Sequence, residues 1–160
     1  MTLKQALLKI PRMKVNFFVP GQPQGKGRAK VTTRGRYAHA YTPAKTVAYE
    51  DLIKTFFYNN DCQHLNGMLK LTVKAFYKIP QSFSRKKRND ALNGNLVPLT
   101  KPDVDNILKV VCDALNGIAY EDDKQIVWQE IFKYYDEVPR LQIEITEVEI
   151  DNFKFVEKDD

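Results

Sequence analysis

The most informative stretch of this chain is KPDVDNILKVVCDALNGIAYEDDKQIV, residues 101–127. Apolar side chains recur in it at helical spacing, at Val104, Ile107, Leu108, Val111 and Leu115. This spacing predicts a helix with one buried face. Pro102 and Asp103 stand where that helix begins, and Asn116-Gly117 supplies its stop.

A row of polar side chains follows another face of the same helix. Asp105, Lys109 and Asp113 are each four residues apart and therefore lie above one another. Acids at a helix N-terminus stabilise it by about 0.3–1 kcal/mol each, so alone they require no further role. Here Lys109 lies beside them, and Asn106 adds a neutral oxygen, which together favour a functional site.

A second acidic cluster, Glu121-Asp122-Asp123, follows the helix at the start of a predicted strand. A strand that returns antiparallel to the helix would bring Asp122 or Asp123 to Asp103 and Asp105. Spacing alone does not choose between Asp122 and Asp123. Three carboxylates without imidazole or thiolate favour Mg²⁺ or Mn²⁺ over Zn²⁺.

Such a metal site can polarise a phosphodiester and convert bound water to a hydroxide nucleophile. A neighbouring lysine such as Lys109 can neutralise the charge that builds on the phosphate. The segment therefore predicts metal-dependent phosphodiester hydrolysis.

The charges of the chain are segregated along its length. Residues 1–101 hold 19 Lys or Arg against 4 Asp or Glu, whereas residues 102–160 hold 6 against 16. The basic part can neutralise a polyanion such as a nucleic-acid backbone. The acidic part would repel that polyanion unless a bound divalent metal offsets its charge.

Two basic runs and one lysine are the predicted DNA contacts. They are Lys26, Arg28, Lys30, Arg34 and Arg36 in a glycine-containing segment, then Arg85, Lys86, Lys87 and Arg88, and Lys101 before the helix. A charge run is usually only a solvated face, but two such runs beside an acid cluster favour phosphate contact. Tyr37, His39 and Tyr41 are able to stack on exposed bases, although core packing is the preferred interpretation of the tyrosines.

The remaining elements indicate one α+β domain over residues 1–160. Strands are predicted at 13–19, 67–79, 125–135 and 140–149, the last two joined as a hairpin by the turn at 136–139. A loop or irregular hairpin is expected between 21 and 41. We expect a single mixed, mostly antiparallel sheet covered by helices.

Two further helices are predicted. The first runs to about Tyr58, with Thr42 as N-cap, Pro43 at its first position and a buried face that includes Val47 and Phe56. The second is short and basic, begins at Ser84 as N-cap and ends at Gly94.

The rest of the composition excludes several classes of protein. No apolar run reaches the roughly 18–20 residues that span a bilayer. Cys62 and Cys112 are too few and too far apart for a familiar zinc site, and Cys112 is expected to be a buried free thiol. Residues 1–11 and 151–160 are expected to be flexible extensions. A cytoplasmic location without an organic cofactor fits these features.

The segment 101–127 closely resembles the core of the RusA family of Holliday junction resolvases, which prophages often carry. The family pattern is Asp-x-Asp-Asn, a lysine four residues after the second Asp, then Asp-Ala-Leu and Asp-Asp-x-Gln-Val. The chain has Asp103 to Asn106, Lys109, Asp113-Ala114-Leu115 and Asp122-Asp123 with Gln125-Ile126. GQPQGKGRAK and HAYTP, residues 21–30 and 39–43, also resemble the family, whose members commonly have Arg-Pro-Arg in place of Arg28-Ala29-Lys30.

The resemblance implies metal-binding roles for Asp103, Asp105 and Asp123 and a catalytic role for Lys109. It selects Asp123 over Asp122. It also implies a homodimeric crossover junction endodeoxyribonuclease that uses Mg²⁺, with Mn²⁺ as an alternative. Such an enzyme resolves four-way or branched DNA by paired symmetric cuts, in recombination or repair.

Two other functions fit parts of the sequence. Pro102-Asp103 followed by Asp122-Asp123-Lys124 resembles restriction-like nucleases, but there both clusters lie on strands, whereas here a helix carries the first. A non-enzymatic protein that binds branched or single-stranded nucleic acid would use the basic segments and leave the acids to structure. A family member that has lost its activity is disfavoured by the four retained residues.

Overall fold

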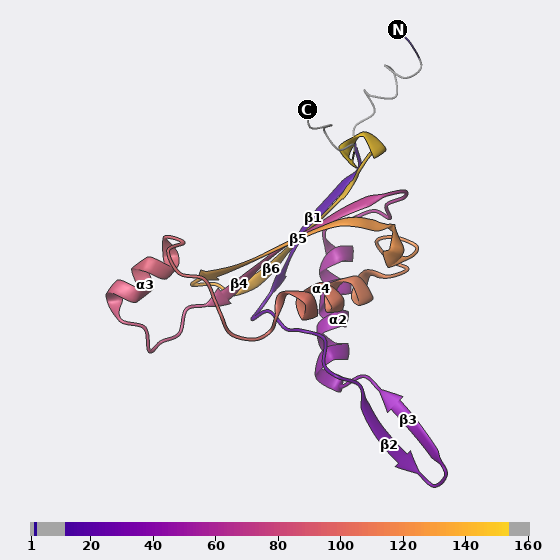
Figure 1. The fold of residues 1–160 in the computed structure, drawn as a ribbon, viewed down its shortest axis with the longest axis horizontal. Coiled ribbons are helices and arrows are strands. Elements are labelled where there is room, and N and C mark those ends of the chain that lie inside the picture. The colour runs from indigo at the N-terminus through magenta and orange to yellow at the C-terminus, as the bar shows by residue number, and fades with distance from the viewer. Residues whose placement is uncertain (1, 3–11, 154–160) are drawn as a thin grey trace, which may run out of the picture.

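The computed structural model describes residue 2 and residues 12–153. The elements run in the order β1 (Lys14–Pro20), β2 (Lys30–Arg34), β3 (Tyr37–Tyr41), α2 (Ala44–Asn59), β4 (Leu69–Lys78), α3 (Arg85–Leu92), α4 (Val104–Leu115), the 3-10 helix η1 (Asp123–Gln125), β5 (Ile126–Asp136), β6 (Arg140–Glu147) and the 3-10 helix η2 (Ile150–Phe153). Strands and helices form one α+β unit from which the β2–β3 hairpin projects (Figure 1).

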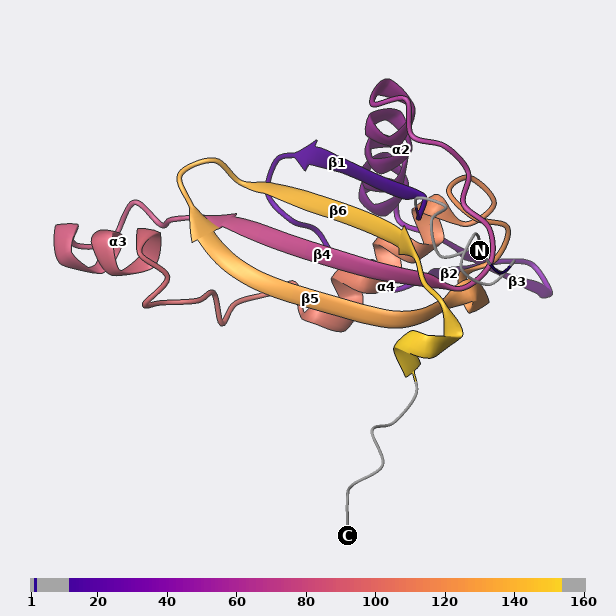
Figure 2. The ribbon, with the colours of Figure 1, turned by 90° about the horizontal axis from the view of Figure 1, so that it is seen from above.

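Four strands form the main sheet in the order β1-β6-β4-β5 (Figure 2). β6 pairs antiparallel with both β1 and β4, whereas β4 pairs parallel with β5. The predicted mixed and mostly antiparallel sheet is therefore confirmed. Parallel neighbours need a long crossover connection, and the chain between β4 and β5 contains α3 and α4.

One face of this sheet makes the core with α2 and α4. The alternation predicted for β4 is confirmed, because the side chains that point to this face are almost fully buried, at Leu69, Leu71, Val73, Ala75 and Tyr77. Every second residue of β6 is likewise buried, at Leu141, Ile143 and Ile145. Period-two burial is expected of strands with one covered face.

The predicted hairpin between the last two strands is wrong. β5 and β6 run antiparallel, but β4 lies between them. The turn at 137–139 therefore spans two strand spacings, about 9.6 Å, instead of one. Burial explains the order: β6 alternates regularly with buried residues and occupies an inner position, whereas no residue of β5 is fully buried and β5 takes the edge.

The helices differ from prediction in detail. α2 has Pro43 as N-cap without a side-chain hydrogen bond, so the Thr42 cap is wrong. Val47 is 42% exposed and the neighbouring Thr46 is buried instead. In α4, Val104 is 41% exposed and Val110 is fully buried, because α4 packs against α2 as well as the sheet. The expected cap of α3 is confirmed, since Ser84 Oγ accepts the Lys87 N–H at 3.2 Å.

The expected C-terminal extension begins within a short helix. Residues 150–153 form η2, where the Phe153 ring meets Trp128 edge-on at a centroid distance of 6.0 Å. The flexibility expected of residues 151–160 stays a prediction. Residues 1, 3–11 and 154–160 lie outside the described part of the chain. No helix among the described residues is long and apolar enough to cross a membrane.

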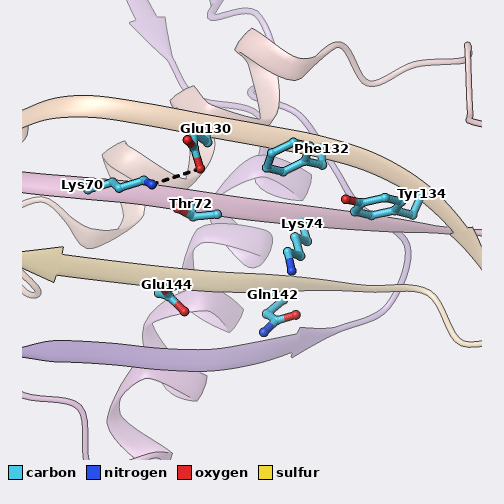
Figure 3. Close-up of a pocket in the computed structure, with 8 residues that line it drawn as sticks. All are labelled: Lys70, Thr72, Lys74, Glu130, Phe132, Tyr134, Gln142 and Glu144. Atoms are coloured by element: carbon cyan, nitrogen blue, oxygen red, sulfur yellow. Dashed lines mark ion pairs between the residues drawn. The ribbon is translucent and has the colours of Figure 1, made fainter. Parts of the chain in front are cut away.

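The second face of the sheet carries half-buried polar and aromatic side chains (Figure 3). Phe132 and Tyr134 of β5 stack at a centroid distance of 6.2 Å, and Lys70 pairs with Glu130 at 3.2 Å. Among the described residues, α2 and α4 cover only one face, and the opposite face is mostly open, with Phe153 of η2 against Trp128 on it.

Truncation of Leu71 to alanine is expected to destabilise the fold by about 2–5 kcal/mol, because its side chain is fully buried between β4 and the helices. The matched control is Thr72→Ala on the open face, with an expected loss of about 1 kcal/mol or less. Urea unfolding followed by circular dichroism measures both. Equal losses would contradict the assignment of the two faces.

Candidate active site

The glycine segment after β1 packs against the start of α4. A Cβ on Gly25 would lie 2.9 Å from Asn106 Cβ and 3.0 Å from Pro102 Cβ. The next residue, Lys26, donates its backbone N–H to the Asn106 carbonyl at 3.1 Å. Gly27 in turn donates its N–H to Thr46 Oγ1 of α2 at 3.0 Å. Glycine permits these close backbone approaches, which join the segment to both helices.

Lys26 links this segment to both helices through its side chain. Its ammonium lies 2.5 Å from Glu50 of α2 and 3.1 Å from Asp113 of α4. Burial lowers the pKa of Lys26, but hydrogen bonds and attraction from the two carboxylates outweigh burial and raise it overall. Lys26 thus holds a structural ion-pair network, in place of the exposed position expected for a DNA contact.

The acidic residues are distributed along α4. Asp103 is the N-cap and Asp105 lies in the first turn. The preceding Pro102 carbonyl accepts a hydrogen bond from the Tyr77 hydroxyl at 2.7 Å, which holds this end of the helix at the sheet. Burial, and then the charge of Asp103, raise the pKa of Tyr77 to about 12.

Asp123 lies at the other end of the same helix. Its backbone N–H donates to Oδ1 of Asn116, the C-cap of α4, at 3.1 Å. Asp103 is the N-cap of α4, so the backbones of the two residues are attached to opposite ends of this helix. Asp123 begins η1, immediately before β5, and its backbone therefore meets the C-terminal end of α4 and not the beginning.

Asp122 and Asp123 have different surroundings. Asp122 Oδ1 accepts the Lys124 N–H at 2.9 Å, and this backbone hydrogen bond lowers the pKa of Asp122. Gln125 Oε1 accepts the Asp122 N–H at 3.0 Å and completes a capping box on η1. Asp122 is therefore engaged as a cap, whereas Asp123 faces the hollow beside α4.

That hollow, about 270 Å³ in volume, is the candidate active site. It is lined by Asp105, Leu108, Lys109, Cys112, Asp113, Asp123 and Gln129. Lys109 is 62% exposed at its side chain and lies 3.8 Å from Asp113. The structure thus brings Asp105, Lys109 and Asp123 to one surface, while Asp103 lies outside its lining.

The carboxylates match the donor chemistry of a hard divalent cation. Asp113 is engaged by Lys26 and Lys109. Within residues 12–153, however, no three His, Cys, Asp or Glu side chains gather closely enough to hold a metal ion. The three-carboxylate site therefore stays a prediction.

Cys112 forms part of the wall of the hollow as a free, buried thiol, as predicted. Burial raises the pKa of this thiol to about 11, and the charges of Asp123 and Asp113 add to the effect. Gln129 Nε2 lies 3.6 Å from its sulfur. Gln129 and Glu50 were not identified from the sequence, because each lies in an otherwise ordinary strand or helix.

The predicted DNA contacts lie on both sides of α4. The β2–β3 hairpin lies at one end of the molecule and α3 at the other (Figures 1 and 2). In α3, Arg85 and Lys86 are exposed, whereas Arg88 pairs with Glu137 at 2.7 Å and the Lys87 ammonium lies 4.2 Å from the Phe83 ring centroid. Lys101 and Arg28, the latter before β2, are both exposed.

Comparison with known proteins identifies related chains. The family described as endodeoxyribonuclease RusA matches residues 20–146. A Bacillus subtilis (strain 168) protein named uncharacterized protein YqaN is 36% identical over 137 residues, which are 84% of this chain and 96% of that protein. Crossover junction endodeoxyribonuclease rusA of Lactococcus phage r1t is 42% identical over 89 residues, 55% of this chain and 61% of that protein.

Replacement of Lys26 by methionine is expected to destabilise the fold by about 1–3 kcal/mol, because it removes the ion-pair partner of Glu50 and the nearer of the two partners of Asp113. Since the pKa of Lys26 is raised in the folded chain, this contribution is present below pH 10.5 and is lost as pH rises through the raised value. Chemical unfolding from pH 7 to pH 11 measures it. The exposed Lys45→Met is the control, and equal effects would contradict the network.

Cys112 is expected to resist alkylation. With a pKa of about 11 its thiol remains protonated at pH 8, so iodoacetamide should modify it at least tenfold more slowly than in the unfolded chain. Peptide mass spectrometry of native and urea-treated protein measures both rates. Rapid native modification at Cys112 would show that the wall of the hollow opens.

Proposed function

Because the chain belongs to the RusA family of endodeoxyribonucleases, we propose that it is a magnesium-dependent endonuclease that resolves four-way DNA junctions. The observation that carries this proposal is one hollow lined by Asp105, Lys109 and Asp123. Basic segments lie on both sides of the helix that forms it. This arrangement suits a reaction in which DNA phosphates must approach clustered carboxylates.

In the proposed site Asp105 and Asp123 hold Mg²⁺ or Mn²⁺, and Asp103 is the third carboxylate. When bound, the ion supplies a Lewis acid for the phosphodiester and a hydroxide at neutral pH. Asp113 is held by Lys26 and Lys109 at 3.1 and 3.8 Å and is left out of the ligand set. Asp122 is left out because it caps η1.

Lys109 is the proposed charge-neutralising residue. Its side chain is 62% exposed, so the ammonium is free to move from Asp113 toward an incoming phosphate. A cation at this position offsets the negative charge that develops on the phosphate oxygens in the transition state. It acts by position and charge, without a covalent intermediate.

The basic side chains would hold the arms of the branched DNA. We assign phosphate contacts to the hairpin, to α3 and to the exposed Arg28 and Lys101. Phosphate contacts of this kind position DNA without reading its sequence. Lys26 contributes indirectly, by holding the glycine segment against α4.

Two symmetric cuts require two active sites, so the proposed enzyme is a two-fold symmetric homodimer. It would act in the cytoplasm, in DNA recombination or repair. Light scattering coupled to size exclusion measures the subunit number directly. A monomer that still makes paired cuts would contradict this part of the proposal.

The central test is cleavage of a synthetic four-way DNA junction with Mg²⁺. The wild-type chain should make paired symmetric nicks, and both Asp105→Asn and Asp123→Asn should cleave at least 100-fold more slowly while still binding DNA. The matched control is Asp122→Asn, which keeps the hollow intact and should retain cleavage. Binding without cleavage by the wild type would instead support the non-enzymatic binding protein or a family member that has lost activity.

A second pair of variants separates this mechanism from a restriction-like one. Lys109→Ala should abolish cleavage and Lys124→Ala should leave it within a few-fold, because Lys109 lines the hollow and Lys124 does not. Cleavage rates from single-turnover assays show which of the two lysines the reaction requires. Loss with Lys124→Ala alone would favour the restriction-like arrangement.

A further inference from the structure

The β2–β3 hairpin has two chemically different faces. The register pairs Lys30 with Tyr41, Thr32 with His39 and Arg34 with Tyr37. Side chains of directly paired residues share a face, and the face alternates along each strand. One face therefore collects all of the basic and aromatic side chains of the two strands. The other holds only small or apolar side chains, at Val31, Thr33, Ala38 and Ala40.

The aromatic side chains of this face are open to solvent. Every residue of both strands is exposed, and the Tyr37 side chain reaches 74% and Tyr41 46% exposure. Within the described part of the chain, the two strands pair only with each other. The core packing expected for these tyrosines is therefore wrong. Tyrosine is ordinarily at least partly buried. Two exposed rings on one projecting face therefore favour a role in binding a partner.

The charge of the hairpin is positive and unopposed. No Asp or Glu precedes Glu50 in the chain, and Glu50 is paired with Lys26. Within the described residues, no hydrogen bond or ion pair engages the side chain of Lys30, Arg34 or Arg36. These cations are therefore available to phosphates.

We propose that this basic-aromatic face binds unstacked bases at the branch point of the DNA, with Tyr37 and Tyr41 as stacking platforms and Lys30 and Arg34 on the flanking phosphates. The inference rests on the proposed function and names the feature of the substrate that the hairpin recognises.

The spacing of the aromatic groups favours unstacked over duplex DNA. Tyr37, His39 and Tyr41 alternate along β3, so neighbouring rings lie about 7 Å apart. Bases within a duplex strand are stacked about 3.4 Å apart and offer no free face to a tyrosine ring. Successive rings can meet successive bases only where stacking is opened, and a branch point is the place where the stack along the exchanging strands is interrupted.

The test compares affinity for a four-way junction with affinity for a linear duplex of the same sequence, in Ca²⁺ in place of Mg²⁺ to suppress cutting. Tyr37→Ala should weaken junction binding at least about fivefold and leave duplex binding unchanged, because an aromatic platform lost from one base has an effect of this size. Tyr37→Phe keeps the ring and should retain junction binding. Arg34→Ala should weaken both substrates and lower the salt dependence.

The matched control is Thr33→Ala, on the opposite face of the same hairpin, which should bind both substrates like the wild type. The thermal midpoint of Tyr37→Ala should equal that of the wild type, since the hairpin projects from the core.

Equal weakening of junction and duplex binding by Tyr37→Ala, or no weakening, would overturn the inference. Loss of dimers in sedimentation of Tyr37→Ala would assign the face to a second copy of the chain and overturn it too. Junction cleavage by the wild type with unaltered binding by Tyr37→Ala would defeat only this inference. Failure of the wild type to bind any branched DNA would defeat the proposed function itself.

Discussion

The parallel pairing of β4 with β5 is the constraint on which the site depends. Two parallel neighbours cannot be joined by a tight turn, so the chain must cross back over the sheet before the second strand begins. α4 forms part of that return. Its polar row therefore lies beside the start of β5, and Asp123 meets the helix at its C-cap through Asn116. The hollow with Asp105, Lys109 and Asp123 on its wall is the consequence.

The glycine segment connects this site to the projecting hairpin. Gly25 packs against the first turn of α4, and Lys26 pairs with carboxylates on α2 and α4. The chain then leaves the core as β2 and returns as β3 to begin α2. A hairpin anchored at its base in this way carries its basic and aromatic face at a defined position relative to the carboxylates, while its tip extends into solvent.

Local sequence patterns predicted most of the individual strands and helices. They did not predict which strands pair or which elements are covered by others. The alternation in β4 and the Ser84 cap were correct because each depends on neighbours in sequence. The predicted pairing of β5 with β6 was wrong. A short turn suggests a hairpin, but β4 lies between the two strands and pairs with both. The core role of Tyr37 was wrong because hydropathy does not reveal that a hairpin lacks a covering layer. Among the acids, the preference for Asp123 over Asp122 came from family resemblance, and the capping box on η1 supplies a physical reason for it.

The central claim is that Asp105 and Asp123 hold the metal that DNA cleavage requires. Crystals of the protein with a four-way junction and Mn²⁺, measured at the manganese absorption edge, test it most directly. The account predicts an anomalous peak in direct contact with the Asp105 and Asp123 carboxylates, from a preparation of the protein that nicks the junction in solution with Mg²⁺. A peak bound instead at Asp113 or Asp122, with none at Asp105, would contradict it.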